Sequence, residues 1–211
     1  MAATTDKPGR LITLEGGEGA GKSSQLATVA DAIGQAGYEV VQTREPGGTA
    51  LGEAVRAVLM ADFDTPMPAM SELLLMFAAR AAHLDEVIEP ALARGAWVVS
   101  DRFTDASFAY QGQGRGLGDA AVATLEALVQ GDRRPDGVLL FDLPVEAGLA
   151  RAGRRGEANR FDRETLAFHD TVRAAYRARA AAAPDRYRII RADAEWQDVA
   201  DQIRRAIAEW L

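Results

Sequence analysis

A glycine-rich octapeptide, Gly16–Ser23, constrains the fold of this chain more than any other segment. It reads GGEGAGKS and fits the pattern G-x-x-x-x-G-K-[ST]. The β-prone run Leu11–Glu15 precedes it, and a helix is expected to begin at Lys22. A strand before and a helix after are the context in which this pattern wraps backbone N–H groups around phosphate oxygens. The segment therefore predicts a phosphate-binding loop, with a chance match in a glycine-rich turn as the alternative.

Each residue type in this loop has a physical reason. Glycines let the backbone curl and approach phosphates closely, and the helix N-terminus adds a favourable dipole. Lys22 is expected to reach the outer phosphates of ATP, and the Ser23 hydroxyl to bind Mg²⁺. The loop residues predicted to bind ATP are Gly16, Gly17, Glu18, Gly19, Ala20, Gly21, Lys22, Ser23 and Ser24.

Strand and helix signals alternate along the rest of the chain. Strands are predicted at 11–15, 38–43, 96–100, 137–141 and 187–191, and helices at about 22–35, 51–60, 71–93, 119–130, 164–182 and 196–210. Alternation of this kind implies a parallel sheet whose ligands bind at the carboxyl ends of the strands. The predicted fold class is α/β: a three-layer, doubly wound, five-stranded parallel sheet with helices on both faces, of the P-loop NTPase type.

Composition and charge further limit the possible functions and partners. With 211 residues and 48% hydrophobic residues, we expect one domain over residues 1–211. A net charge of −7 argues against a nucleic-acid partner, because phosphate backbones require a basic surface. The absence of cysteine suits a reducing compartment, so the cytoplasm is expected. No apolar run approaches membrane-spanning length, and no membrane partner is expected.

A second polar motif follows the third predicted strand, where a doubly wound sheet places its chemistry. Asp101 can hold the Mg²⁺ shell or orient a reacting oxygen, and Arg102 can bind a phosphate through two hydrogen bonds. An Asp-Arg pair can also be an ordinary surface ion pair. Its position after an apolar strand favours the functional interpretation.

Five segments, taken in order, resemble those of the bacterial thymidylate kinases, and together they span almost the whole chain. They are the phosphate loop with Glu18, the segment Thr43–Thr49 (TREPGGT), the segment Met76–Arg80 (MFAAR), Asp101-Arg102 with Ser107, Tyr110 and Gln111 following, and the basic stretch Arg151–Arg163. The resemblance implies a P-loop nucleoside monophosphate kinase that uses Mg²⁺. Its reaction would move the γ-phosphate of ATP to thymidine monophosphate (dTMP), giving dTDP for dTTP biosynthesis.

The resemblance also implies the acceptor site. Arg80 matches the arginine that donates to the exocyclic oxygen of thymine, and Ser107 and Gln111 match positions that bond the base edge. Met76 stands at the stacking position, where the family has an aromatic residue, and Phe77 is one place away; both are expected to line the site, with helix core as the alternative.

Further matches complete this acceptor set. Tyr110 matches the ring beside the deoxyribose, and Arg56 and Arg102 match the arginines that grip the acceptor phosphate. Glu18 matches an acidic loop residue that works near the acceptor and the metal. The expected dTMP-binding residues are Glu45, Pro46, Arg56, Met76, Phe77, Arg80, Arg102, Ser107, Tyr110 and Gln111.

The phosphate loop contains no arginine, so the resemblance implies that the catalytic cation comes from a mobile lid at about 152–163. Arg155 and Arg160 are the expected donors, with Arg151 nearer the adenine and Asp162 as an acidic lid residue. A charged, solvated loop is the alternative. The predicted catalytic residues are Lys22, Glu18, Asp101, Arg102, Arg155 and Arg160, and the predicted metal ligands are Ser23 and Asp101.

Two rival functions stay open at this point. One is another small kinase of the same build with a different acceptor, and the other is a nucleotide-dependent switch that hydrolyses ATP or GTP slowly. The switch predicts effector loops and no paired acceptor-phosphate arginines. His83 and His169 lack partners at metal-ligand spacing and are expected to be packing or surface residues. The family resembled forms homodimers, so ATP, dTMP and a second copy are the expected partners.

Overall fold

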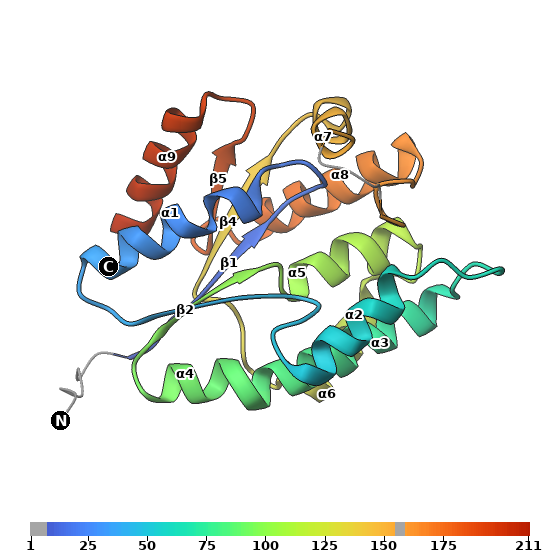
Figure 1. Cartoon of the computed structure of the whole chain (residues 1–211), viewed down its shortest axis with the longest axis horizontal. Coiled ribbons are helices and arrows are strands. Elements are labelled where there is room, and N and C mark those ends of the chain that lie inside the picture. The colour runs from blue at the N-terminus through green and yellow to red at the C-terminus, as the bar shows by residue number, and fades with distance from the viewer. Residues whose placement is uncertain (1–7, 155–158) are drawn as a thin grey trace.

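The structure is a computed structural model that describes residues 8–154 and 159–211. Its fold is built around one open parallel sheet. The strands are β1 (Leu11–Glu15), β2 (Val40–Arg44), β3 (Trp97–Asp101), β4 (Gly137–Asp142) and β5 (Tyr187–Arg191). They pair in the order β2-β3-β1-β4-β5, and every pairing is parallel (Figure 1). The predicted α/β class with a five-stranded parallel sheet is confirmed.

Helices cover both faces of the sheet (Figure 1). On one face, α1 (Lys22–Gln35) and α9 (Trp196–Ala208) pack against alternate strand residues such as Ile12 and Leu14. On the other, α4 (Glu89–Ala93) packs over Leu11, and α8 (Leu166–Ala182) over Val138. Side chains of successive strand residues point to opposite faces, so a central strand covered on both sides is buried along its whole length, as β1 is.

The remaining helices surround these two layers. They are α2 (Ala50–Met60), α3 (Ala69–His83), α5 (Thr104–Ser107), α6 (Asp119–Gln130), α7 (Val145–Ala152) and two π-helical segments, η1 (Leu84–Ile88) and η2 (Phe108–Gly114). Thr49 caps α2, and Thr165 caps α8, each accepting from a backbone N–H three residues on. No helix within the described ranges is long and apolar enough to cross a bilayer.

The structure differs from the predicted elements in two places. The single helix predicted at 71–93 is instead α3, η1 and α4 in succession. Pro90 stands at the start of α4 and has no N–H to donate, so the regular hydrogen-bond pattern changes just before it. The helical run of α5 and η2 was not expected, because Gly112 and Gly114 are poor helix formers.

The three neighbouring strands β2, β3 and β1 end at the same edge of the sheet. Asp101 lies opposite Leu14 of β1 and opposite Arg44 of β2. The segments that leave these strands therefore start from one edge of the sheet. This edge is where a doubly wound fold binds its ligands.

Candidate active site

The phosphate loop after β1 needs glycine at defined positions. Gly16 has φ 139° and Gly19 has φ 69°, conformations that residues with a Cβ rarely adopt. A Cβ added at Gly16 would lie 2.4 Å from the carbonyl oxygen of Phe141, and one at Gly19 would lie 1.9 Å from that of Gly148. Neighbouring backbone from β4 and α7 thus touches the loop directly. The loop keeps its curled shape because only glycine fits there.

Lys22 opens α1 and points back into the loop. Its Nζ donates to the carbonyl oxygens of Gly16 and Gly17, both at 2.9 Å. Burial lowers the pKa of Lys22 to about 8, and the nearby charge of Arg102 adds to this lowering. The ammonium group is therefore held inside the loop as a compact cation at the place where phosphates would lie.

Ser23 and Asp101 bring two oxygen atoms together beside the loop. The Ser23 hydroxyl donates to Oδ2 of Asp101 at 2.5 Å, and Oδ1 of Asp101 is buried without a hydrogen-bond partner. Within the described residues, no cluster of three or more acidic, histidine or cysteine side chains is placed to hold a metal. Two protein oxygens fit an ion such as Mg²⁺, which keeps several waters and takes other ligands from phosphates.

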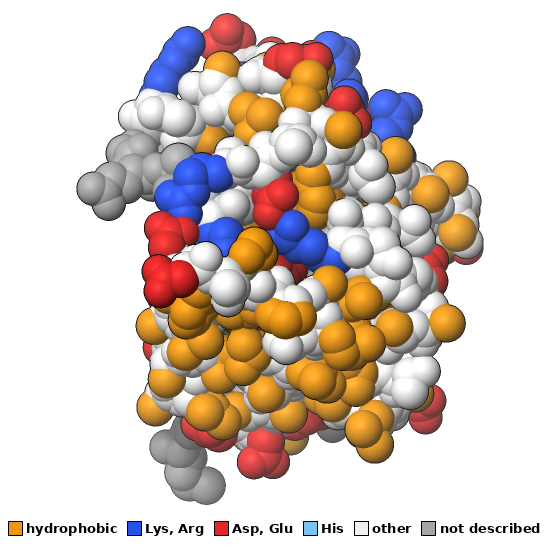
Figure 2. Space-filling view, turned by 90° about the vertical axis from the view of Figure 1, so that its right-hand side faces the viewer, with side chains coloured by type: hydrophobic (Ala, Val, Ile, Leu, Met, Phe, Trp, Pro, Cys, Tyr) orange, Lys and Arg blue, Asp and Glu red, His pale blue; other side chains and the backbone are white. Residues whose placement is uncertain are grey.

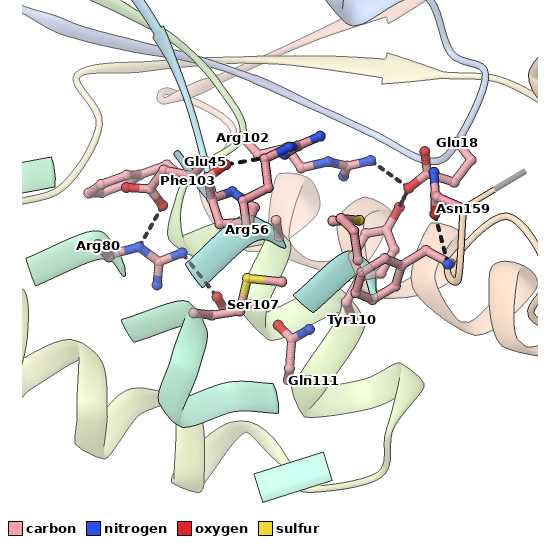
Figure 3. A pocket seen from close by; sticks show the side chains of 15 residues that line it. Glu18, Glu45, Arg56, Arg80, Arg102, Phe103, Ser107, Tyr110, Gln111 and Asn159 are labelled. Carbon is pink, nitrogen blue, oxygen red and sulfur yellow. Dashed lines mark hydrogen bonds and ion pairs between the residues drawn. The ribbon is translucent and has the colours of Figure 1, made fainter. Parts of the chain in front are cut away.

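Arg102 links the end of β3 to the phosphate loop. Its Nη1 donates to the Gly16 carbonyl at 2.9 Å, and its Nη2 donates to Oε1 of Glu18 at 2.8 Å. The hydroxyl of Tyr110 donates to the same Glu18 oxygen at 2.8 Å, and the Arg102 guanidinium lies over the Tyr110 ring (Figure 3). Burial alone would raise the pKa of Glu18, but the charges of Arg102 and Lys22 outweigh it and lower the pKa to about 2.

A pocket opens beside Arg102. Figure 3 shows Glu45, Arg80, Ser107, Tyr110 and Gln111 around it. Its lining residues are Glu18, Glu45, Pro46, Arg56, Met60, Met76, Arg80, Arg102, Phe103, Ala106, Ser107, Tyr110, Gln111, Asn159 and Phe161. Every residue expected to bind dTMP lies in this set except Phe77. The walls of the pocket combine apolar side chains such as Met76 and Phe103 with five charged side chains.

Phe77 does not line the pocket, contrary to the expectation for it. Its side chain is buried in the core with Leu73 and Phe108, and its ring lies under the guanidinium of Arg80 at 4.6 Å. Successive helical residues point about 100° apart, so a helix that turns Met76 toward the pocket turns Phe77 away from it. Of these two side chains, Met76 is the one that lines the pocket.

Arg80 is held by two neighbours and keeps one donor group without a partner. Its Nε donates to Oε2 of Glu45 at 2.8 Å, and Nη2 donates to the Ser107 hydroxyl at 3.0 Å (Figure 3). Its Nη1 is buried and has no hydrogen-bond partner. His83 is fully buried and contacts the other oxygen of Glu45 through Nδ1 at 2.9 Å. The helix α3 thus presents a fixed guanidinium at the pocket wall.

A second hollow lies over the phosphate loop and borders the pocket. Lys22, Ser23, Asp101 and Arg102 line it. The residues that line both hollows are Glu18, Glu45, Arg56, Arg102 and Asn159. In Figure 2 basic and acidic side chains gather in the hollowed middle of the face shown. Two anionic ligands could therefore meet end to end at Glu18 and Arg102.

Of the two lid arginines predicted to be catalytic, the one that the structure describes does not line the hollow over the phosphate loop. Arg155 lies outside the described residues. Arg160 forms an ion pair with Glu72 at 2.7 Å and donates to the carbonyl of Leu59, whereas Arg151 donates to the carbonyl of Ala192. Ser24, which was predicted to bind ATP, is exposed at the start of α1. Asp162 does line the hollow over the phosphate loop.

Several lining residues were missed in the sequence. They are Met60, Phe103, Ala106, Asn159 and Phe161. Phe161 is the single aromatic residue of the basic stretch, and an apolar ring among so many arginines was a signal that the stretch packs on something. His169, expected to be a packing or surface residue, is buried, with its ring perpendicular to that of Phe168.

The fold, the phosphate loop and the adjoining charged pocket define a P-loop kinase that brings two phosphate-bearing ligands together. Comparison with known proteins gives the family: a family model described as thymidylate kinase matches residues 14–203. The chain belongs to the thymidylate kinase family.

Individual relatives agree with this assignment. The chain is 55% identical over 201 residues to the thymidylate kinase of Alcanivorax borkumensis, covering 95% of this chain and 97% of that protein. It is 59% identical over 182 residues to that of Pseudomonas fluorescens, covering 86% and 87%. A crystal structure of thymidylate kinase from Ehrlichia chaffeensis superposes with a TM-score of 0.71 at 32% identity, covering 87% of this chain and 93% of that one.

Proposed function

We propose that this thymidylate kinase holds ATP in the hollow over the phosphate loop and dTMP in the adjoining pocket. The protein is an ATP-dependent phosphotransferase, and its reaction gives dTDP. One observation carries the division of roles: Glu18, Arg56 and Arg102 line both hollows. The γ-phosphate of ATP and the phosphate of dTMP would meet at these side chains, where the guanidinium groups of Arg56 and Arg102 can offset the combined negative charge.

On the donor side, backbone N–H groups of the loop and Lys22 hold the phosphates of ATP. The kinase uses a divalent metal, and we assign it as Mg²⁺. Ser23 and Asp101 would hold it, since Asp101 has a buried oxygen without a partner. The ion neutralises phosphate charge when bound. In-line placement of two phosphates needs little proton transfer, so no histidine is assigned a chemical role.

On the acceptor side, Arg56 and Arg102 bind the phosphate of dTMP. Arg80 offers its unpartnered Nη1 to the exocyclic oxygen of thymine, and Met76 covers one face of the ring. Ser107 and Gln111 lie at the base edge. Glu18 and Tyr110, joined by a hydrogen bond, stand beside the sugar. A ring at this place leaves no room for a 2′-hydroxyl and so favours a deoxynucleotide.

The roles of Arg155 and Arg160 as cations for the transferring phosphate, and of 152–163 as a mobile lid of one domain, stay predictions. The cytoplasmic location also stays a prediction. A homodimer is proposed because exposed apolar side chains recur on three adjacent helices: Leu51 on α2, Leu74 on α3 and Leu128 on α6. Figure 2 shows apolar side chains gathered over the lower half of the molecule, where these helices lie in Figure 1.

The test of this division is the substitution Arg102→Ala, assayed for transfer to dTMP and for ATP binding. Loss of a guanidinium that lines both hollows should lower kcat by roughly 100-fold or more, with ATP affinity changed only a few-fold. Arg94→Ala, which removes an exposed arginine paired with Glu39, is the matched control and should behave as the wild type. Equal losses of ATP affinity and of transfer would contradict the assignment of Arg102 to the acceptor phosphate.

A further inference from the structure

A fully buried carboxylate on α3 contacts the acceptor pocket from behind. Glu72 has no exposed surface, and its Oε1 accepts from Nε2 of Gln111 at 2.7 Å. The same carboxylate binds Arg160 at 2.7 Å and Arg115 at 3.2 Å. Glu72 is absent from the pocket lining, so it can act on a ligand only through one of these partners.

We propose that Glu72 is a positioning residue that sets the base preference of the acceptor pocket by fixing the side-chain amide of Gln111. The inference rests on the proposed function of the pocket as the dTMP site. Glu72 itself touches no substrate; it determines which end of the Gln111 amide faces the base.

The orientation of the amide follows from donor and acceptor chemistry. A carboxylate can only accept hydrogen bonds, so the NH₂ group of Gln111 must face Glu72. Reversing the amide would place its oxygen against the carboxylate oxygen and leave a buried acceptor opposed to another. Within the described part of the chain, no donor contacts Oε1 of Gln111. Since Gln111 lines the pocket, this oxygen is the group that it offers to a ligand.

Glu72 is itself held firmly. Arg115 reaches from Glu72 to Glu164, which accepts from its Nη1 at 2.6 Å. Arg160 reaches from Glu72 to the carbonyl of Leu59 at 3.0 Å. The carboxylate therefore lies in a buried network with partners on α2, on the segment after η2 and on the segment before α8. Nη2 of Arg115 and Nη2 of Arg160 are buried without partners, but both oxygens of Glu72 accept hydrogen bonds, and these bonds restrict the orientation of the carboxylate.

The fixed side chains of Arg80 and Gln111 together match the hydrogen-bonding groups of a particular base edge. Arg80 presents a donor, and Gln111 presents an acceptor beside it. Thymine offers the complementary pattern, an exocyclic carbonyl next to the N3–H donor. Cytosine offers the reverse, an amine next to an unprotonated N3, and would leave polar groups of the site opposed at both positions. Glu72 thus favours thymine over cytosine without contacting either base.

The experiment compares kcat/KM for dTMP and dCMP in the wild type and in Glu72→Gln. The glutamine keeps the shape but can donate as well as accept, so it permits the reversed Gln111 amide. We expect the preference for dTMP over dCMP to fall by roughly tenfold. Glu164→Gln removes a carboxylate from the same Arg115 without contact to Gln111, and should keep the wild-type ratio. A ratio that is unchanged in Glu72→Gln overturns the proposal, whether or not overall activity falls.

A second measurement needs no variant. The N3-methyl analogue of dTMP keeps both exocyclic carbonyls but has no N3–H to donate, so the wild type should use it with at least roughly tenfold lower kcat/KM. Equal use of dTMP and this analogue would overturn the assignment of an acceptor at Gln111. Failure of the proposed function would look different, because the wild type would then show no preference for dTMP over dCMP at all.

Discussion

Arg102 has φ 71°, and among the described non-glycine residues it is the one with a positive φ. A left-handed conformation at such a residue costs about 1–3 kcal/mol. The surrounding backbone holds it there: its N–H donates to the Leu14 carbonyl at 3.0 Å, and its carbonyl accepts from the Ser100 hydroxyl at 2.7 Å. The turn sends the guanidinium back toward Gly16 and Glu18. The strained backbone conformation of Arg102 therefore lies where the two hollows meet.

The pKa of Lys22 makes ATP binding depend on pH. Burial lowers this pKa from 10.5 to about 8 in the free protein, and phosphates placed beside the ammonium raise it again. ATP binding near pH 8.5 should therefore take up protons, and ATP affinity should weaken as the pH rises through about 8. Calorimetry in buffers of different ionisation enthalpy measures this uptake. Lys22→Arg keeps its charge and should show none; equal uptake by the variant would assign the protons to another group.

At the scale of elements, α7 approaches the phosphate loop through glycine. A Cβ at Gly148 would lie 2.4 Å from the carbonyl oxygen of Glu18, and one at Gly19 would meet the carbonyl of Gly148. Helix α7 follows β4 directly and leads into the basic stretch. This contact therefore joins the loop that holds phosphates to the helix that precedes the predicted lid.

The substitution Gly148→Ala should separate these two elements. We expect it to reduce the free energy of unfolding by about 1–3 kcal/mol and to weaken ATP binding by roughly tenfold, because the added methyl group displaces the loop. Gly34→Ala on α1 is the matched control, since nothing lies within 4 Å of its Cβ position and alanine favours the helix. Urea denaturation and ATP titration measure both variants. Wild-type ATP affinity in Gly148→Ala would show that the loop does not depend on this approach.

Sequence patterns predicted the elements whose signals lie within a few neighbouring residues. They did not predict features that depend on contacts between distant parts of the chain. The five strands and the loop at Gly16–Ser23 were predictable because apolar runs and glycine spacing lie within a few residues. The orientation of α3, which separates Met76 from Phe77, depends on packing against α2 and α6. The ion pair between Arg160 and Glu72 joins residues that are 88 apart, and no local pattern indicates it.

At the scale of the whole molecule, the apolar face on α2, α3 and α6 predicts self-association. Leu128 is 78% exposed on α6, and Leu128→Arg should place charge in the interface and shift a dimer toward monomer. Light scattering after size-exclusion chromatography measures this mass. Ile189→Arg, at an exposed position of the edge strand β5, is the control and should leave the mass unchanged. A monomeric wild type would contradict the proposed homodimer.

The edge of the sheet at which β1, β2 and β3 end has a thermodynamic consequence. Nucleotides bound at that edge touch segments from widely separated parts of the chain, and those segments are neighbours only while the sheet is intact. Ligand and sheet therefore melt together, and each concentration step of nucleotide should raise the melting temperature of the entire protein rather than of one loop. A cell poor in nucleotides would hold this enzyme closer to its unfolding threshold than one that is rich in them.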